Sequence, residues 1–391
     1  MRRAGTALLA ATACLAALPG APAWAGTPGT TGGPAVATAT AAPRCTGTAP
    51  ILCHADVPPG TYDVTAVLGG ARSGSTSVTA ESRRAMLAAT PTAAGQRLIR
   101  SFTVNVREPE GEPTGPSGSP GLDLAFGGAA PRLAGLRVTR VLKITKVPKV
   151  TKVPEVTRVP EVTQVAEAAQ AAEAAPSRHH QLFLAGDSTV CDQLTAPYTG
   201  WGQQLPQFFR RGLSVANYAD SGESSGSFLA DPRLFATMRP LIRAGDTVLI
   251  QFAHNDKQTT AADYRAHLGA LLDGIRARGG KPVLVTPIVR RWFNDDGTLD
   301  NATALHINGL GVNLPAETRS LAAERGVPLI DLTTLTKRRV EELGPEESKR
   351  LYLYDEARDN THTSAHGATE FARLVLGELR AQHLVPAGVL R

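Results

Sequence analysis

From residue 181 onwards, strand-like and helix-like segments alternate, and this alternation constrains the fold more than any other feature of the sequence. Residues 247–252 form a nearly continuous apolar run, which is typical of a parallel strand covered on both faces. We therefore expect a parallel sheet with helices on both sides, a three-layer α/β/α domain over residues 179–391. The predicted strands span 182–186, 213–218, 247–252, 282–287 and 328–331, and the predicted helices 200–211, 261–278, 314–325, 332–343 and 366–380.

The first predicted strand ends abruptly in Gly186-Asp187-Ser188, residue types that favour tight turns and helix N-termini. Ser188 therefore stands at the carboxyl end of a strand, where open α/β sheets bind their ligands. The alternative is that Asp187 or Ser188 only caps the next helix, because Asp and Ser are common caps. The choice between these two interpretations depends on what else lies at the same edge of the sheet.

Three more polar segments follow predicted strands or lie near the end of the domain, at 217–224, 252–256 and 359–362. The strand ends of one parallel sheet meet at one rim, so we expect these segments near Ser188. In a turn or a first helical turn, Asp359 and His362 would lie on the same side. Asp359 could then orient His362 as the base that a serine nucleophile needs. The backbone N–H groups of Ser188 and Gly222 and the side-chain amide of Asn255 could hold an oxyanion.

With these segments the chain resembles the SGNH (GDSL-type) hydrolases, and most of all their rhamnogalacturonan acetylesterase branch. The resemblance implies that the α/β/α domain is of flavodoxin-like type. The resemblance implies Ser188 as nucleophile, His362 as base and Asp359 as its partner. It also implies an oxyanion hole of Ser188, Gly222 and Asn255. The resemblance covers about 180–385 and rests on Gly186-Asp187-Ser188-Thr189-Val190, Gly200-Trp201-Gly202-Gln203, Ser221-Gly222-Glu223-Ser224-Ser225, His254-Asn255-Asp256 and Asp359-Asn360-Thr361-His362.

The resemblance further implies removal of acetyl groups from a pectic polysaccharide, without a cofactor. We expect a monomeric serine esterase with no metal site, whose partner is its acetylated polysaccharide substrate. Because His362 must be neutral to accept a proton, activity should fall at acid pH. The family glycine is replaced by Ala253, which should leave Asn255 in place.

Other functions stay open on the sequence alone. An acetylxylan esterase or a general short-chain carbohydrate esterase or lipase is the first alternative, because the loops at 219–235 and 288–313 would select the substrate. The alternative of another class is an inactive secreted carbohydrate-binding protein. The intact set of candidate site residues argues against a loss of activity.

Two rival sites use neighbouring residues. The segment Gly222-Glu223-Ser224-Ser225-Gly226 matches the G-x-S-x-G elbow, which would make Ser224 the nucleophile. Position favours Ser188, since it follows the first strand, whereas that elbow lies further into its sheet. His362 and His366 have the i, i+4 spacing of a zinc pair, but threonine stands at 363, where the H-E-x-x-H motif has glutamate.

The chain begins with features of a secretory signal at 1–25: two arginines, a short apolar segment and an A-x-A site that ends at Ala25. We therefore expect secretion with cleavage after Ala25. Residues 26–43 are rich in Gly, Thr, Ala and Pro and are predicted to be a disordered leader. Alternating segments between turn residues predict a small β-sandwich of jelly-roll type over 44–142, an accessory domain. A hexapeptide repeat with regular prolines and an Ala/Glu stretch predict a semi-rigid linker over 143–178.

Cysteine spacing and charge narrow the remaining possibilities. Cys45 and Cys53 are eight apart in a chain predicted to be exported, so a small-loop disulfide is plausible, and Cys191 is predicted to be an unpaired packing residue. The formal net charge of +6 is spread along the chain without a basic stripe, which argues against a nucleic-acid partner. After signal removal, no apolar run reaches the roughly 18 residues that a membrane span needs.

Overall fold

The computed structural model describes residues 40–116, 118–141 and 179–391. Contacts join Thr38–Arg391 into one compact unit. The predicted signal at 1–25, most of the predicted leader and the predicted linker at 143–178 lie outside the described residues. In the described ranges, no helix is long and apolar enough to cross a membrane.

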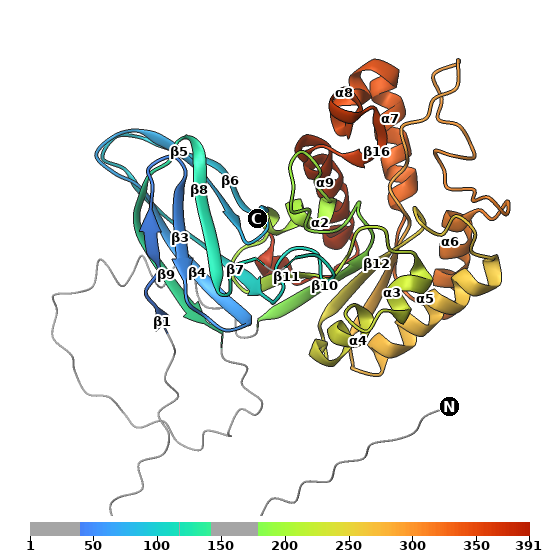
Figure 1. The fold of residues 1–391 in the computed structure, drawn as a ribbon, viewed down its shortest axis with the longest axis horizontal. Helices are drawn as coiled ribbons and strands as arrows, with labels where there is room; N and C mark the ends of the chain where they lie inside the picture. The colour runs from blue at the N-terminus through green and yellow to red at the C-terminus, as the bar shows by residue number, and fades with distance from the viewer. Residues whose placement is uncertain (1–39, 117, 142–178) are drawn as a thin grey trace, which may run out of the picture. The chain divides into compact units, whose positions relative to one another are not determined.

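The described residues before 142 form two antiparallel sheets (Figure 1). Along β4, buried and partly exposed positions alternate over most of the strand, so one face lies in the core between the sheets, which contains Tyr62, Phe102 and Phe126. This β-rich part was predicted, and its jelly-roll topology stays a prediction. One sheet has the order β1 (Thr40–Ala41), β9 (Leu133–Arg140), β4 (Gly60–Gly69), β7 (Arg97–Val106), and the other has β2 (Arg44–Thr46), β3 (Ile51–Ala55), β8 (Leu122–Ala130), β5 (Gly74–Ala80), β6 (Arg84–Thr92).

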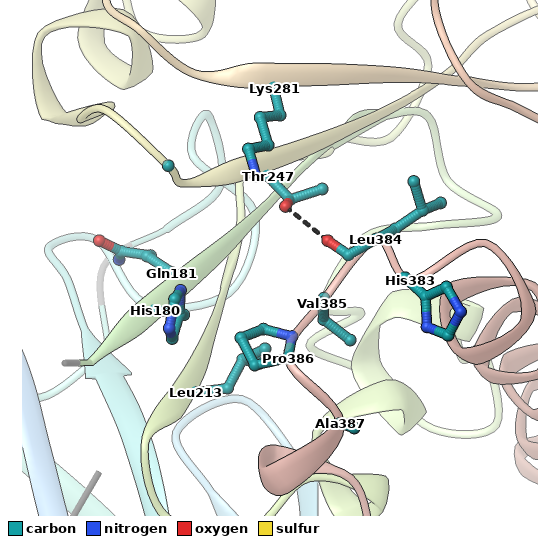
Figure 2. Close-up of a pocket in the computed structure, with 11 residues that line it drawn as sticks. His180, Gln181, Leu213, Thr247, Lys281, His383, Leu384, Val385, Pro386 and Ala387 are labelled. Atoms are coloured by element: carbon teal, nitrogen blue, oxygen red, sulfur yellow. Dashed lines mark hydrogen bonds between the residues drawn. The ribbon is translucent and has the colours of Figure 1, made fainter. Parts of the chain in front are cut away.

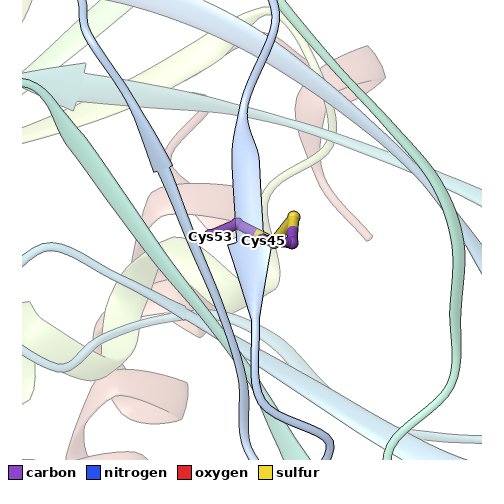
Figure 3. The surroundings of a disulfide bond; sticks show 2 residues. All are labelled: Cys45 and Cys53. Carbon is purple, nitrogen blue, oxygen red and sulfur yellow. A yellow bond between two sulfur atoms is a disulfide. The ribbon is translucent and has the colours of Figure 1, made fainter.

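Cys45 and Cys53 face each other across β2 and β3 and form a disulfide (Figure 3). This confirms the predicted pairing. Cys191 is a buried free thiol, as predicted for a packing residue. The end of the predicted leader differs from expectation, because Thr40–Ala41 pairs with β9 through backbone hydrogen bonds.

The residues from 180 onwards contain a five-stranded parallel sheet in the order β11-β10-β12-β13-β14. Each predicted strand is present, with ends that agree within two residues. The order corresponds to 2-1-3-4-5, the flavodoxin-like arrangement, whose ligand site lies where the chain crosses from one side of the first strand to the other. The strands are β10 (His180–Gly186), β11 (Leu213–Asn217), β12 (Thr247–Gln251), β13 (Lys281–Val285) and β14 (Leu329–Ile330).

Helices cover both faces of this sheet (Figure 1). The residues of β10 alternate between the two cores that result. Leu182 and Leu184 belong to one core, and Phe183 and Ala185 belong to the other. The first core is closed by α2 (Trp201–Gln204), α7 (Leu332–Glu347) and α9 (Ala365–Ala381), and the second by α3 (Ser225–Ala230), α4 (Phe235–Met238), α5 (Ala261–Arg276) and α6 (Leu314–Arg325).

Local sequence explains where the helices depart from the prediction. The helix predicted at 200–211 is split into α2 and a 3₁₀ turn at Leu205–Phe208, since Pro206 lacks the N–H that continues an α-helix. The helix predicted at 332–343 continues to Glu347 across a kink at Gly344. Several short elements were not predicted, among them α3, α4, β15 (Tyr352–Leu353), α8 (Tyr354–Ala357) and β16 (Asp359–Thr363).

Candidate active site

The turn that carries Ser188 begins where β10 ends. A side chain at Gly186 would approach Gln251 O to 2.9 Å, so only glycine fits there. The Asp187 carboxylate accepts hydrogen bonds from Thr189 N at 2.9 Å and Thr189 Oγ1 at 2.7 Å. Asp187 therefore closes this turn and does not cap a helix, which corrects the alternative interpretation. Ser188 itself is only 7% exposed.

Asp359 and His362 lie on β16 and not in a helical turn. Residues three apart on a regular strand would point to opposite faces, but the Asp359 carboxylate bends back to its own segment. It accepts hydrogen bonds from Thr361 N at 2.7 Å and His362 N at 3.0 Å. This local turn brings the two side chains together.

The three predicted catalytic side chains form one hydrogen-bonded relay. Asp359 Oδ2 lies 2.6 Å from His362 Nδ1, and His362 Nε2 lies 2.9 Å from Ser188 Oγ. Burial opposes ionisation of Asp359, but the hydrogen bonds from His362 and Thr361 outweigh it and lower the pKa of Asp359 to about 2. An ionised carboxylate only accepts, so His362 Nδ1 carries the proton. In the neutral ring, Nε2 is then the acceptor for the Ser188 hydroxyl.

The remaining predicted residues lie on two neighbouring turns. Gly222 has φ of +82°, a conformation that favours glycine. Asn255 Nδ2 donates to Glu223 O at 3.1 Å, which uses one of its two N–H bonds. Asn255 therefore sits beside the Gly222 turn, although Ala253 replaces the family glycine with φ of 157°.

Gln193 connects the Ser188 turn with the Gly222 turn. Its Nε2 donates to Ser188 O at 3.0 Å and to Ser221 Oγ at 3.3 Å. The backbone adds a second link, because Asp220 N donates to Gly186 O at 3.0 Å. The five predicted site residues are therefore connected in the structure. Ser188, Asp359 and His362 form the relay, the Gly222 turn is joined to the Ser188 turn, and Asn255 is bonded to Glu223 of the Gly222 turn.

A buried pair behind the nucleophile turn had no assigned role in the sequence prediction. His254 Nδ1 lies 3.1 Å from Asp187 Oδ2, and both side chains are almost fully buried. Burial lowers the pKa of His254. Burial opposes ionisation of Asp187, but the charge and hydrogen bond of His254 lower the Asp187 pKa. The His254-Asn255-Asp256 block contained this residue, but only the fold shows that it contacts Asp187.

The rival sites do not assemble. Ser224 is the N-cap of α3, and its hydroxyl accepts a hydrogen bond from Ser227 N. His362 lies on β16 whereas His366 lies on α9, where it pairs with Glu370 at 3.0 Å, so the two histidines do not share one helix face. In the described part of the chain, no group of three or more His, Cys, Asp or Glu is placed to hold a metal ion.

A pocket of about 270 Å³ lies at the opposite edge of the sheet (Figure 2). Its lining includes the first residues of four strands, His180, Leu213, Thr247 and Lys281. Thr247 Oγ1 donates there to Leu384 O at 2.9 Å. Since Ser188 follows the carboxyl end of β10, this pocket is separate from the relay.

A flavodoxin-like sheet with a Ser–His–Asp relay at its carboxyl edge is the arrangement of a serine hydrolase. Comparison with known proteins agrees: the GDSL-like Lipase/Acylhydrolase family model matches residues 184–369. Rhamnogalacturonan acetylesterase RhgT of Bacillus subtilis is 39% identical over 211 residues, which cover 50% of this chain and 87% of that protein. The chain belongs to the GDSL-like lipase/acylhydrolase (SGNH) family, and it is an ester hydrolase.

Two further matches come from the same organism. The probable rhamnogalacturonan acetylesterase YesY of Bacillus subtilis is 30% identical over 208 residues, which cover 50% of this chain and 90% of that protein. The crystal structure of protein YxiM from Bacillus subtilis matches with a TM-score of 0.49 and 22% identity, over 87% of this chain and 81% of that chain.

Proposed function

We propose that this protein is a secreted esterase that removes O-acetyl groups from a pectic polysaccharide of the rhamnogalacturonan type. The observation that carries the proposal is the hydrogen-bonded relay Asp359–His362–Ser188. The substrate is proposed from the names of relatives, one of them a rhamnogalacturonan acetylesterase that is 39% identical. Secretion is proposed from the signal features of residues 1–25, and a monomer is proposed as well.

In the proposed first half-reaction, His362 Nε2 takes the proton of Ser188 Oγ while Oγ attacks the acetyl carbonyl carbon. The carbonyl oxygen becomes an oxyanion, which the N–H groups of Ser188, Gly222 and Asn255 stabilise. The bond between the acyl carbon and the sugar oxygen then breaks, and His362 gives its proton to that oxygen. The products of this step are the deacetylated sugar hydroxyl and an acetyl group on Ser188.

In the second half-reaction, water attacks the acetyl carbon as His362 Nε2 takes one of its protons. The bond to Ser188 Oγ breaks, His362 returns the proton to Oγ, and acetic acid leaves, which releases its remaining proton to solvent as acetate. Asp359 stays ionised throughout, because its pKa is about 2, and it stabilises the imidazolium that forms twice in each cycle.

An exposed arginine beside the relay supports an anionic polymer as the substrate. Arg358 precedes Asp359, is exposed, and places its guanidinium carbon 5.0 Å from the Tyr354 ring centre. The neighbouring Arg291 is buried and donates to Ser348 Oγ and Asn360 Oδ1, so Arg358 is the cation that this argument uses. Galacturonate residues of a pectic polymer carry carboxylates that an exposed guanidinium can bind.

The test is acetate release from acetylated rhamnogalacturonan, acetylated xylan and a short-chain aryl acetate. Wild type, Ser188→Ala and Ser224→Ala are compared. We expect release from the pectic polymer by wild type and Ser224→Ala, with a loss of at least about 10³-fold in Ser188→Ala. Release only from xylan or the aryl ester would refute the pectic substrate. Loss in Ser224→Ala with activity in Ser188→Ala would refute the site.

A further inference from the structure

The segment that follows β7, residues 107–114, belongs to the β-rich part of the chain but reaches the Gly222 turn. Arg107 Nη2 donates to Asn217 O at 2.6 Å, and its guanidinium carbon lies 5.1 Å from the centre of the Tyr218 ring. Thr114 N donates to Asp220 Oδ2 at 2.7 Å. Residues 107–114 therefore contact the turn at several successive positions.

Glu112 lies at the centre of these contacts. Its Oε1 accepts hydrogen bonds from Ser221 Oγ and, at 3.0 Å, from Cys191 Sγ. Burial raises the pKa of the Cys191 thiol well above its usual range, and the neighbouring Glu112 charge raises it further. The thiol is therefore protonated at neutral pH and acts as a donor to Glu112.

A short path leads from Glu112 to the nucleophile. Ser221 Oγ, which donates to Glu112, accepts from Gln193 Nε2 at 3.3 Å. The same Gln193 nitrogen donates to Ser188 O at 3.0 Å. The Glu112 carboxylate thus holds the Ser221 hydroxyl. The carbonyl of Ser221 and the N–H of Gly222 belong to the same peptide bond.

Domain docking alone does not explain this arrangement. Arg84 and Asp192 already join the β-rich part to the α/β part through a fully buried ion pair at 2.8 Å. Glu112 instead directs its charge at two neutral donors, the hydroxyl of Ser221 and the thiol of Cys191. The negative charge of Glu112 near the site where the oxyanion forms is electrostatically unfavourable. We therefore expect an offsetting benefit, which is the fixed position of Ser221.

We propose that Glu112 is a positioning residue of the active site, supplied by the β-rich part of the chain, which holds Ser221 and with it the Gly222 N–H. Glu112 acts through Ser221, and it makes no contact with the reacting atoms in this role. The donor geometry matters most when the oxyanion forms, so Glu112 affects kcat more than KM. The inference rests on the proposed roles of Ser188 and Gly222.

The experiment measures kcat and KM for an aryl acetate in Glu112→Ala, Glu112→Gln, Ser221→Ala and the double variant. We expect Glu112→Ala to lower kcat by about 10- to 100-fold, less than the loss of a complete oxyanion donor, with KM within about twofold. Glu112→Gln keeps an acceptor oxygen and should restore most of kcat. The double variant should be no slower than the slower single variant, since the two changes share the loss of the Glu112–Ser221 hydrogen bond, through which Glu112 is proposed to act.

Glu108→Ala is the matched control, because Glu108 is an exposed glutamate of the same segment that accepts from Gly121 N at 3.3 Å. Wild-type kcat in Glu112→Ala, equal losses in Glu112→Gln and Glu112→Ala, or fully additive losses in the double variant would overturn the proposal. If Glu112→Ala does not fold, Ser221→Ala with wild-type kcat would overturn it as well. Ser188→Ala in the same assay distinguishes a failure of this inference from a failure of the proposed function. Wild-type kcat in Ser188→Ala would refute the proposed function itself.

Discussion

At the scale of single residues, Asp359 determines how the relay works. Its carboxylate accepts three hydrogen bonds, two from backbone N–H groups and one from the His362 ring. Those bonds keep it ionised although it is partly buried. The ionised carboxylate in turn fixes the His362 tautomer, which directs Nε2 towards Ser188.

Asp359→Asn should lower kcat by about 10³- to 10⁴-fold with little change in stability, because the amide can place an N–H against Nδ1 and favour the wrong tautomer. The measurement is kcat for an aryl acetate, with the thermal midpoint as the control for folding. A variant that retains more than about a tenth of wild-type kcat would show that Asp359 does not orient His362.

The pH dependence of wild type follows from the same residue. The pKa of Asp359, lowered to about 2, keeps it charged at every pH above about 4. The loss of kcat/KM towards acid pH should therefore reflect the uptake of a single proton, and Asp359 should not be the group that takes it up. A log–log slope of two between pH 4 and pH 7 would contradict this, because it would require a second group to protonate.

At the scale of elements, carboxyl groups in the β-rich part add a different pH effect. Glu81 lies between β5 and β6, where burial and the nearby carboxyl of Glu110 raise its pKa to about 9. The folded state thus holds a proton at pH 7 that the unfolded chain releases above about 4.5. This contribution to stability is complete below that pH and is lost as pH rises towards 9.

Glu81→Gln removes this titration. We expect the difference between the thermal midpoints of the variant and of wild type to increase with pH. At pH 8 the midpoint of the variant should be about 2 to 4 °C above that of wild type. Glu356→Gln is the control, since Glu356 is exposed and lies on α8, outside the β-rich part. A midpoint difference that is constant from pH 5 to pH 9 would contradict the buried, protonated state of Glu81.

The sequence predicted the parallel strands well because each is a short apolar run, such as Thr247–Gln251, that is buried on both faces. It did not predict β16, whose residues Asp359–Thr363 are mostly polar and become a strand only by pairing with Tyr352–Leu353. Asp359 and His362 were still found, since a three-residue spacing allows contact through a local turn. The sequence did not indicate that the Asp359 carboxylate itself forms this turn, by accepting hydrogen bonds from the N–H groups of Thr361 and His362.

Other parts of the site could not be predicted because they depend on tertiary contacts. Glu112 lies in a stretch of Pro, Gly and Glu with no periodicity, and its neighbours Ser221 and Cys191 are far away in sequence. The contact of His254 with Asp187 also spans two strand ends. Residue types at strand ends can indicate a shared rim, but they do not indicate which side chains meet there.

At the scale of the whole molecule, the β-rich and α/β parts are joined by buried polar groups. Arg84 pairs with Asp192 and also donates to Asn105 O at 2.8 Å. Gln203 Nε2 donates to Ser82 O in the β-rich part at 2.6 Å. The same nitrogen donates to the backbone oxygen of Gln193, whose side chain bonds to Ser188 O. Buried ion pairs are costly to break from one side, so this interface favours one fixed arrangement of the contacting residues.

The central claim is that Ser188 is the nucleophile of this esterase, and covalent labelling tests it most directly. Wild-type protein is treated with a serine-directed organophosphate, and the adduct is located by peptide mass spectrometry. We expect one adduct, on the peptide and residue of Ser188, and none in His362→Ala over the same time, because the base activates the hydroxyl. An adduct on Ser224, or equal labelling of the His362→Ala variant, would contradict the account.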